Sequence, residues 1–362
     1  KIQFYVILMK ELEIRRTEVN TFFKPVNDTA AIEQLNKELS ADGGRTAVIS
    51  GCIDTQKVHI SSAVSQNYKF MLVITSDEAK ARNMCDDAAF FNGEALYYPA
   101  KDAIFYSADV TGNQITGQRL KCISRLIEHI KAVDSKDGQD GGLLTLVTTI
   151  DGVSDRLVPL KRYMESVITI DSTSEIDTEK LAKKMVQMGF TRTGMVEDKG
   201  QFSIRGGIID IFSYTDEVPV RIELWDTEVD SIRMFDAESQ RSIEKLKSYH
   251  IFPATEFLFT EEEKQAGLDK IRKERDEQLE CFDYGKRKRA QEQIEAGNNI
   301  NKLVGDVERT GNYSKFLDTI IKDTAGLIEY FPVEDTLIVL DEPNRLKECN
   351  ELTLYEYGES MK

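Results

Sequence analysis

The chain has 362 residues, of which 41% are hydrophobic and 30% are charged, and it carries a formal net charge of −16. This length exceeds what one hydrophobic core usually supports, so two domains or a divided domain are expected. The negative charge disfavours tight binding of the whole chain to a DNA backbone, which attracts lysine and arginine. A role on nucleic acid therefore requires a local basic patch or another segment altogether.

The N-terminal residues and the cysteines indicate a cytoplasmic protein. The apolar run in residues 1–16 is too short to span a bilayer and no small-residue cleavage site follows it, so no membrane association is expected. The missing initiator methionine suggests a piece of a longer protein. The five cysteines are widely separated and form no C-x-x-C pair, which favours reduced thiols over disulfides or a zinc site.

The first part of the chain alternates strands with helices. Short apolar runs with β-branched residues at 46–50, 70–75 and 143–149 predict buried parallel strands, and residues 119–133 predict a helix that crosses between them. The sequence "GGRT" at 43–46 precedes a strand and is interpreted as a turn.

The pattern changes after about residue 162. A helix at 177–188 is followed by closely spaced strands with turn signals, which predicts an α+β segment with an antiparallel sheet. Residues 260–297 are dense in charged residues and predict a solvated helical arm. A last apolar strand follows and ends in Asp341 and Glu342.

Residues 47–60, "AVISGCIDTQKVHI", nearly match the nucleotide-binding pattern G-x-x-x-x-G-K-[ST]. Gly51 and Lys57 are in register, but Gln56 replaces the second glycine and Val58 replaces the hydroxyl residue. Glycine allows the backbone to wrap around a phosphate, and the hydroxyl binds Mg²⁺. The pattern therefore favours a degenerate nucleotide site.

A strand that ends in Asp341 and Glu342 is how a P-loop ATPase presents a magnesium-binding carboxylate and a water-activating base. Together with the first motif, it supports descent from an ATPase. The histidines, His59, His129 and His250, fit no nucleophile arrangement, so no catalytic residue and no metal site are predicted in this chain.

Two strands after residue 219 predict a hairpin with a turn at 226–227. Because strand side chains alternate, Val220, Ile222 and Leu224 should face the core, with Ile232 and Met234 on the next strand. The opposite face is predicted to carry Arg221, Glu223, Trp225, Arg233 and Phe235. Arginine and tryptophan are enriched where partners bind, but the same residues would also suit cross-strand pairs.

Three stretches, "GQFSIRGGIIDIF" at 200–212, "PVRIELWDTEVDSIRMFDAESQRSIE" at 219–244 and "YFPVEDTLIVLDEP" at 330–343, resemble the N-terminal, UvrB-like region of bacterial transcription-repair coupling factors. The resemblance extends from about residue 25 onward.

The resemblance implies a degenerate P-loop, RecA-like parallel-sheet domain of α/β class with an inserted α+β antiparallel-sheet domain and a helical arm. Its boundaries would be an extension at 1–26, a first part of the P-loop domain at 27–161, the insertion at 162–246 and the second part at 247–362, with the arm at about 260–300. In this family the inserted domain docks onto the repair protein UvrA. The resemblance implies Arg205, Arg221 and Arg233 as docking residues, and the predicted outward face adds Glu223 and Trp225.

The family function implied for the chain is an interaction module without a cofactor of its own. The full-length protein would be an ATP-dependent translocase on double-stranded DNA that displaces stalled RNA polymerase, with ATP and Mg²⁺ bound by motor domains outside this sequence. The alternative is a UvrB-type ATPase that verifies DNA damage. UvrB clamps DNA with a long aromatic hairpin, whereas residues 97–120 here are short and poor in basic residues; Tyr97, Tyr98 and Phe105 are expected to pack under a loop.

Overall fold

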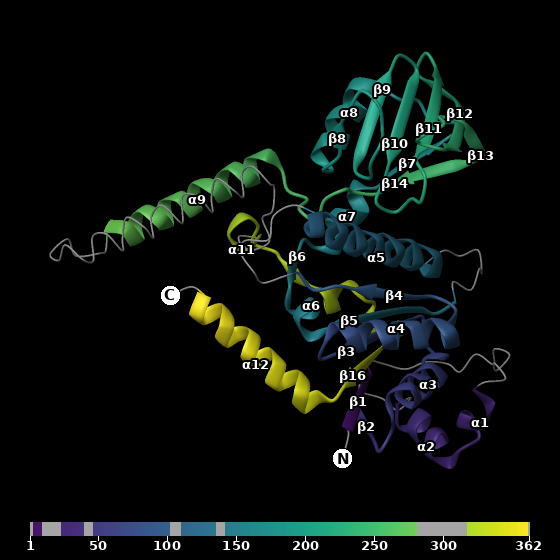
Figure 1. Ribbon diagram of the computed structural model, residues 1–362, viewed down its shortest axis with the longest axis vertical. Helices are drawn as coiled ribbons and strands as arrows, with labels where there is room; N and C mark the ends of the chain where they lie inside the picture. Colours follow the sequence, from purple (N-terminus) through teal and green to yellow (C-terminus); the bar gives the residue numbers. More distant parts are fainter. Residues whose placement is uncertain are drawn as a thin grey trace. The chain divides into compact units, whose positions relative to one another are not determined.

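The computed structural model describes residues 3–8, 23–39, 46–101, 110–134, 142–280 and 317–360. Its contacts divide the chain into two compact units, which Figure 1 shows as a ribbon. Unit 1 comprises Lys1–Asp155 and Gly326–Lys362, and unit 2 comprises Arg156–Ala325. Unit 2 is therefore inserted into unit 1 and continues beyond residue 246, where the resemblance placed the end of the inserted domain.

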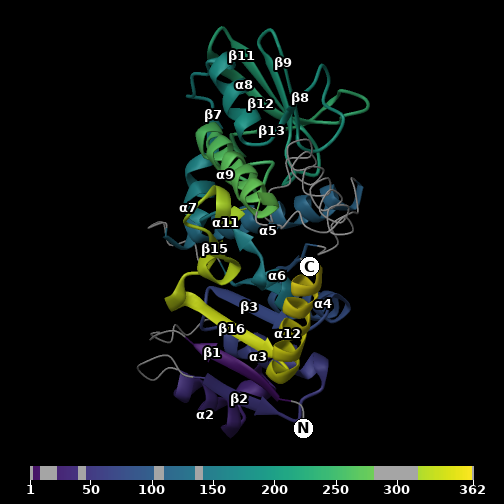
Figure 2. The ribbon, with the colours of Figure 1, turned by 90° about the vertical axis from the view of Figure 1, so that its left-hand side faces the viewer.

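In its described part, unit 1 is built on a six-stranded sheet with the order β2-β1-β16-β3-β5-β4. The strands are β1 (Gln3–Leu8), β2 (Thr46–Ser50), β3 (Phe70–Thr75), β4 (Ala95–Tyr98), β5 (Leu144–Thr149) and β16 (Thr336–Asp341). The neighbours β16, β3, β5 and β4 run parallel, which confirms the predicted parallel sheet. β1 pairs antiparallel with β16 and with β2, as Figure 2 shows, so part of the predicted N-terminal extension belongs to this sheet.

Helices cover both faces of the sheet in unit 1. They are α1 (Lys24–Asn27), α2 (Ala30–Leu39), α3 (Asp54–Ser65), α4 (Glu78–Asn92), α5 (Val110–Asp134), α6 (Ile150–Ser154) and α12 (Pro343–Ser360), with the short turns η2 (Leu327–Tyr330) and η3 (Val333–Asp335). Helices α3 and α4 lie on one face and α5 on the other (Figure 1), the arrangement that right-handed crossovers give for this strand order. Met71 and Val73 belong to the core on the first face, and Phe70 meets the ring of His129 edge-on from the second.

The described part of unit 2 contains a six-stranded sheet with the order β13-β12-β11-β10-β9-β8. Its strands are β8 (Thr191–Arg192), β9 (Gln201–Arg205), β10 (Ile208–Phe212), β11 (Val220–Trp225), β12 (Glu228–Phe235) and β13 (Ser242–Leu246). Every neighbouring pair except β8 and β9 is antiparallel, as predicted. The mixed α/β class with one mainly parallel and one mainly antiparallel sheet is thus confirmed.

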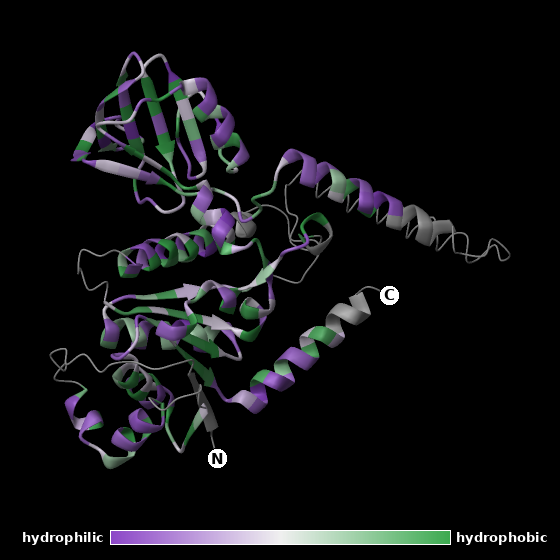
Figure 3. Cartoon of the chain, turned by 180° about the vertical axis from the view of Figure 1, so that it is seen from behind, coloured by the Kyte–Doolittle hydropathy of each residue, from purple (hydrophilic) through white to green (hydrophobic). Residues whose placement is uncertain are grey.

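One face of this sheet is covered by α8 (Thr178–Gln187) and by the paired strands β7 (Ile168–Asp171) and β14 (Ser248–Ile251). The side chain of Asp177 accepts hydrogen bonds from two backbone N–H groups of the first turn, which starts α8 at the predicted position. Leu181 and Met185 of α8 pack into one apolar cluster with Phe202, Ile209 and other inward residues of the strands. Figure 3 shows the resulting alternation of hydrophobic and hydrophilic residues along the strands.

The remaining described elements of unit 2 are β6 (Arg156–Leu157), α7 (Leu160–Ser166), α9 (Glu261–Glu280), α11 (Leu317–Ile320) and β15 (Ala325–Gly326). The start of α9 is held by Arg162, whose two Nη atoms donate to Glu263 at 2.9 and 3.0 Å. The predicted helical arm corresponds to α9 as far as Glu280, and its remainder lies outside the described residues. Phe105 and Cys281 also lie outside them.

Candidate functional sites

The predicted hairpin in unit 2 forms as expected and its two faces differ as the alternation requires. Val220 and Ile222 are buried in the core, whereas Arg221 and Glu223 lie on the opposite, outer face. A shift in register opposite Glu223 and Leu224 leaves Asp230 as an extra residue on β12, while Leu224 still packs against the core as predicted. Trp225 follows this shift and is 80% exposed, next to the turn residue Asp226 with a φ of 58°.

A buried carboxylate organises the predicted arginines of the outer face. Asp210 on β10 has a side chain that is 1% exposed. It accepts hydrogen bonds from Arg221 at 2.6 and 3.0 Å and from Arg205 at 2.7 Å. The hydrogen bonds to Asp210 outweigh desolvation and raise the pKa of Arg221. Arg221 is 15% exposed and Arg205 is 44% exposed, so a partner can reach Arg205 more readily.

The second pair of predicted residues is also joined across the strands. Arg233 on β12 donates to Glu223 on β11, and the hydroxyl of Ser231 donates to the same Glu223 oxygen at 2.8 Å. Phe235 lies on the outer face as predicted, but it is fully buried, and the guanidinium of Arg221 lies 4.3 Å from its ring centroid. These contacts hold the flat guanidinium groups in fixed positions, which lowers the entropy that a partner must remove on binding.

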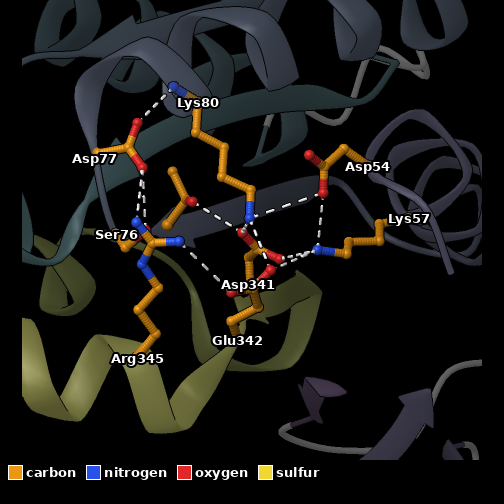
Figure 4. Close-up of polar contacts among 9 residues, drawn as sticks. Asp54, Lys57, Ser76, Asp77, Lys80, Asp341, Glu342 and Arg345 are labelled. Atoms are coloured by element: carbon orange, nitrogen blue, oxygen red, sulfur yellow. Dashed lines mark hydrogen bonds and ion pairs between the residues drawn. The ribbon is translucent and has the colours of Figure 1, made fainter. Parts of the chain in front are cut away.

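A third set of contacts, in unit 1, joins the residues of the P-loop-like pattern. We call it the Lys57 cluster, and Figure 4 shows its members Asp54, Lys57, Lys80, Asp341 and Glu342. The ammonium group of Lys57 is completely buried and lies 2.7 Å from Asp341, 2.9 Å from Asp54 and 3.2 Å from Glu342. Burial alone would lower the pKa of Lys57, but the hydrogen bonds to Asp341 and Asp54 raise it well above its ordinary value.

Lys80 is a second ammonium group in the Lys57 cluster. It lies 2.6 Å from Asp341, 3.1 Å from Glu342 and 3.7 Å from Asp54. A hydrogen bond from Lys57 lowers the pKa of Asp54. Burial favours the neutral form of Glu342, but its hydrogen bonds from Lys80 and Lys57 lower its pKa nevertheless. The Lys57 cluster thus brings two ammonium groups into direct contact with three carboxylates.

The backbone at the P-loop-like pattern differs from a phosphate cradle. Helix α3 begins at Asp54, so Gln56 is an exposed residue in its first turn and not part of a loop. Only residues 51–53 separate β2 from the helix, with Gly51 at a φ of 89°. Val58 is buried in the core and offers no oxygen. These residues do not fit a nucleotide with its Mg²⁺, which needs a loop of free N–H groups and a hydroxyl.

Comparison with known proteins bears on both units. Residues 168–257 match the family model of the UvrB interaction domain. Residues 168–257 are called the UvrB interaction domain below, after this model. The match begins at the first residue of β7 and ends shortly after β14, and so includes the whole antiparallel sheet together with α8. Arg205, Asp210, Arg221 and Arg233 all lie within the UvrB interaction domain, whereas the Lys57 cluster lies outside it.

The similarity to curated proteins extends over nearly all the chain. It is 31% identical over 356 residues to the transcription-repair-coupling factor of Bacillus subtilis strain 168, which covers 94% of this chain and 28% of that protein. It is 28% identical over 312 residues to the transcription-repair-coupling factor of Staphylococcus aureus strain Mu50, with 85% and 25% covered. The chain thus spans about a quarter of the length of these relatives, and the resemblance to a UvrB-like coupling-factor module is confirmed.

Two further findings concern other classes of site. In the described ranges, no group of three or more histidine, cysteine or acidic side chains has an arrangement suited to a metal ion. None of the described helices is both long enough and apolar enough to cross a membrane. Tyr97 and Tyr98 are buried, with the guanidinium of Arg119 4.4 Å from the Tyr98 ring centroid, so neither ring presents a face on which a base could stack.

Sequence reasoning missed four residues that the structure brings into these sites, of which Asp54 lies inside the P-loop-like stretch itself. In the sequence, Asp210 is a single acidic residue between Ile209 and Ile211. Its only signal was that alternation places it on the outer face of β10. Thr75 ends β3 and donates to Asp341 at 2.9 Å, and Lys80 lies in the first turn region of α4. No pattern in the sequence linked Thr75 or Lys80 to the strand that ends in Asp341.

Proposed function

We propose that this chain is a docking module for UvrA, and that its UvrB interaction domain binds UvrA through the outer face of the sheet. The observation that carries the proposal is the 80% exposed Trp225 beside arginines that Asp210 and Glu223 hold in place. A large exposed aromatic and pre-oriented arginines are the side chains that dominate binding energy at protein interfaces. Arg205 and Trp225 are the contact residues, while Arg221, Arg233 and Glu223 complete the surface.

We further propose that the whole protein recruits excision repair to stalled RNA polymerase and moves along double-stranded DNA at the expense of ATP. RNA polymerase, DNA, ATP and Mg²⁺ would bind regions outside this sequence, in keeping with the quarter of the relatives' length that the chain covers. The cytoplasm is the proposed location.

The chain itself is proposed to neither bind nor hydrolyse ATP, and its unit 1 to be a degenerate P-loop domain of RecA-like descent. Three features support this: Lys57 is fully buried among carboxylates, α3 begins before Gln56, and Val58 replaces the hydroxyl residue. The same features speak against the alternative of a UvrB-type ATPase that verifies damage. Such an ATPase requires Lys57 to reach phosphates and Asp341 to hold Mg²⁺.

The docking proposal is tested by titration calorimetry of the chain with UvrA. Trp225→Ala and Arg205→Ala are expected to weaken binding at least about tenfold each, because each removes an exposed contact residue at the same end of the sheet, where β11 and β9 finish. Matched controls are Met195→Ala and Arg192→Ala, which alter exposed residues near the opposite edge strand β8 and should leave affinity unchanged. Unaltered affinity of both test variants would move the UvrA site elsewhere.

The nucleotide proposal is tested by thermal unfolding of the chain with and without MgATP. A ligand at about 100 times its dissociation constant adds about 2.7 kcal/mol of stability, so binding would be visible as a higher melting temperature. We expect no change. A rise that disappears in Lys57→Ala, or phosphate release that does so, would support the UvrB-type ATPase instead.

A further inference from the structure

The carboxylates of the Lys57 cluster are contacted by two ammonium groups of the chain itself, those of Lys57 and Lys80. Both oxygens of Asp341 are in use: one accepts from Lys57 at 2.7 Å, and the other accepts from Lys80 at 2.6 Å and from Thr75 at 2.9 Å. The Asp341 side chain is 1% exposed. An ionised carboxylate at this depth needs a cation within contact distance.

In a P-loop ATPase the negative charge of the corresponding carboxylate is compensated by the Mg²⁺ that accompanies the nucleotide. Here the side chain of Lys80, which starts in the helix after β3, reaches the same carboxylate. Its ammonium lies 2.6 Å from Asp341 and 3.1 Å from Glu342, so a single cation serves both acids.

We propose that Lys80 is the built-in cation of this site and takes the place of a divalent metal ion beside Asp341 and Glu342. The inference rests on the proposed loss of nucleotide binding. It adds that the ammonium group of Lys80 replaces the Mg²⁺ that would otherwise lie beside the two carboxylates. The backbone of Glu342 agrees with this role. Its φ of 51° is unfavourable for a residue with a side chain, and such a conformation persists only where surrounding contacts fix it, here the two lysines and the nearby Arg345.

Lys80 also connects the two separate chain segments that make up unit 1. Unit 2 is inserted between residues 155 and 326 of unit 1, so Lys57 and Lys80 lie on one side of the insertion and Asp341 and Glu342 on the other. The cluster joins α3 and α4 to the end of β16 through contacts between residues 284 and 262 positions apart. Its function is therefore to hold together the two separate chain segments of unit 1 without a ligand.

The test is thermal unfolding of Lys80→Met, without nucleotide, in MgCl₂ and in NaCl of equal ionic strength. Removing Lys80 leaves three carboxylates against Lys57, so the melting temperature should fall by about 5 °C in NaCl. About 10 mM Mg²⁺ should restore at least about 2 °C of that loss by binding where the ammonium was. Lys37→Met, which removes an exposed lysine from α2, is the matched control and should show neither effect.

Lys80→Met/Asp341→Asn removes one positive and one negative side chain, which restores the net charge of the parent cluster, and it should lose the response to Mg²⁺ because the carboxylate beside the ammonium position is gone. The proposal is overturned if Lys80→Met melts within about 1 °C of the parent chain, or if it gains no more from Mg²⁺ than Lys37→Met does. If Lys80→Met does not fold in NaCl, recovery of the folded circular dichroism spectrum in MgCl₂ supports the proposal and its absence overturns it. Stabilisation of the unmodified chain by MgATP would instead refute the proposed loss of nucleotide binding, and UvrA affinity reports on docking alone.

Discussion

Replacing Arg221 by alanine is predicted to destabilise the UvrB interaction domain, although Arg221 lies on the outer face of the sheet. Arg221 donates to Asp210 at 2.6 and 3.0 Å and to Gln240 at 2.7 Å, and its guanidinium covers the ring of Phe235. Without it, the buried carboxylate of Asp210 keeps the 2.7 Å contact with Arg205 but loses two charge-assisted hydrogen bonds.

The size of the effect follows from the burial of Asp210. Removing one partner of a buried ion pair costs about 3–5 kcal/mol, because the other charge remains buried. Since Arg205 stays in contact with Asp210, we expect a loss at the lower end, about 3 kcal/mol. One kcal/mol shifts the melting temperature of a domain of 150–250 residues by about 2–4 °C, so a fall of about 6–12 °C is expected.

The assay is urea and thermal unfolding followed by circular dichroism for Arg221→Ala, Asp210→Asn and the double variant. The double variant should lose less than the sum of the singles, with a coupling energy of at least about 1 kcal/mol. Arg192→Ala, in the exposed part of β8, is the control and should change stability by less than about 0.5 kcal/mol. A loss that small for Arg221→Ala, or zero coupling, would refute the reasoning and make the pair equivalent to a solvent-exposed salt bridge.

Three further outcomes are expected. Trp225 is the only tryptophan of the chain and is 80% exposed, so its fluorescence emission maximum should change little when urea unfolds the protein. The maximum should move to shorter wavelength when UvrA covers the ring. A short-wavelength maximum in the free chain would contradict the exposure of Trp225. Gly189→Ala should lower the free energy of unfolding by at least about 2 kcal/mol, because φ is 88° and a Cβ would lie 2.6 Å from a side-chain carbon of Thr255. Gly206→Ala, at a φ of 60° but in open space, should lower it by about 1 kcal/mol. Equal losses of the two variants in urea unfolding would refute this. The folded protein lowers the pKa of Asp54 below 3.8 and that of Glu342 below 4.5, so both carboxylates stabilise the fold above their unfolded pKa values. The melting temperature should therefore fall as the pH drops from about 4.5 toward the folded pKa values. The fall should be smaller in Lys80→Met, which lacks one of the groups that lower these pKa values.

The strands could be predicted from the sequence wherever the local pattern decides. Runs such as 46–50 and 70–75 are apolar, β-branched and bounded by polar residues, and they form β2 and β3 with the predicted bounds. The place of β1 could not be predicted in the same way. Its partners are set by contacts across the whole chain, with Phe4 opposite Asp341, and no local signal carries that information.

The same distinction applies to the candidate sites. Alternation along β11 was enough to place Arg221 and Glu223 on the outer face, because it depends only on strand geometry. Their ion-pair partners depend on which strands are neighbours, so Asp210 was missed. Phe235 was assigned to the correct face but not to a buried position, since alternation does not reveal contacts such as that of the Arg221 guanidinium with its ring.

The pattern of loss and retention in the P-loop-like stretch follows from these contacts. Gln56 is exposed and Val58 packs in the core, so neither departure from the pattern leaves a buried charge without a partner. Lys57 and Asp341 are different, because both are buried ionisable groups in direct contact. Removing Lys57 would leave Asp341 with Lys80, and removing Asp341 would leave Lys57 with Asp54 and Glu342, so each single change costs part of the about 3–5 kcal/mol that breaking a buried pair costs. On the proposal that the chain does not bind nucleotide, Lys57 and Asp341 are kept for the stability of unit 1, and their presence alone is no evidence that this chain binds ATP.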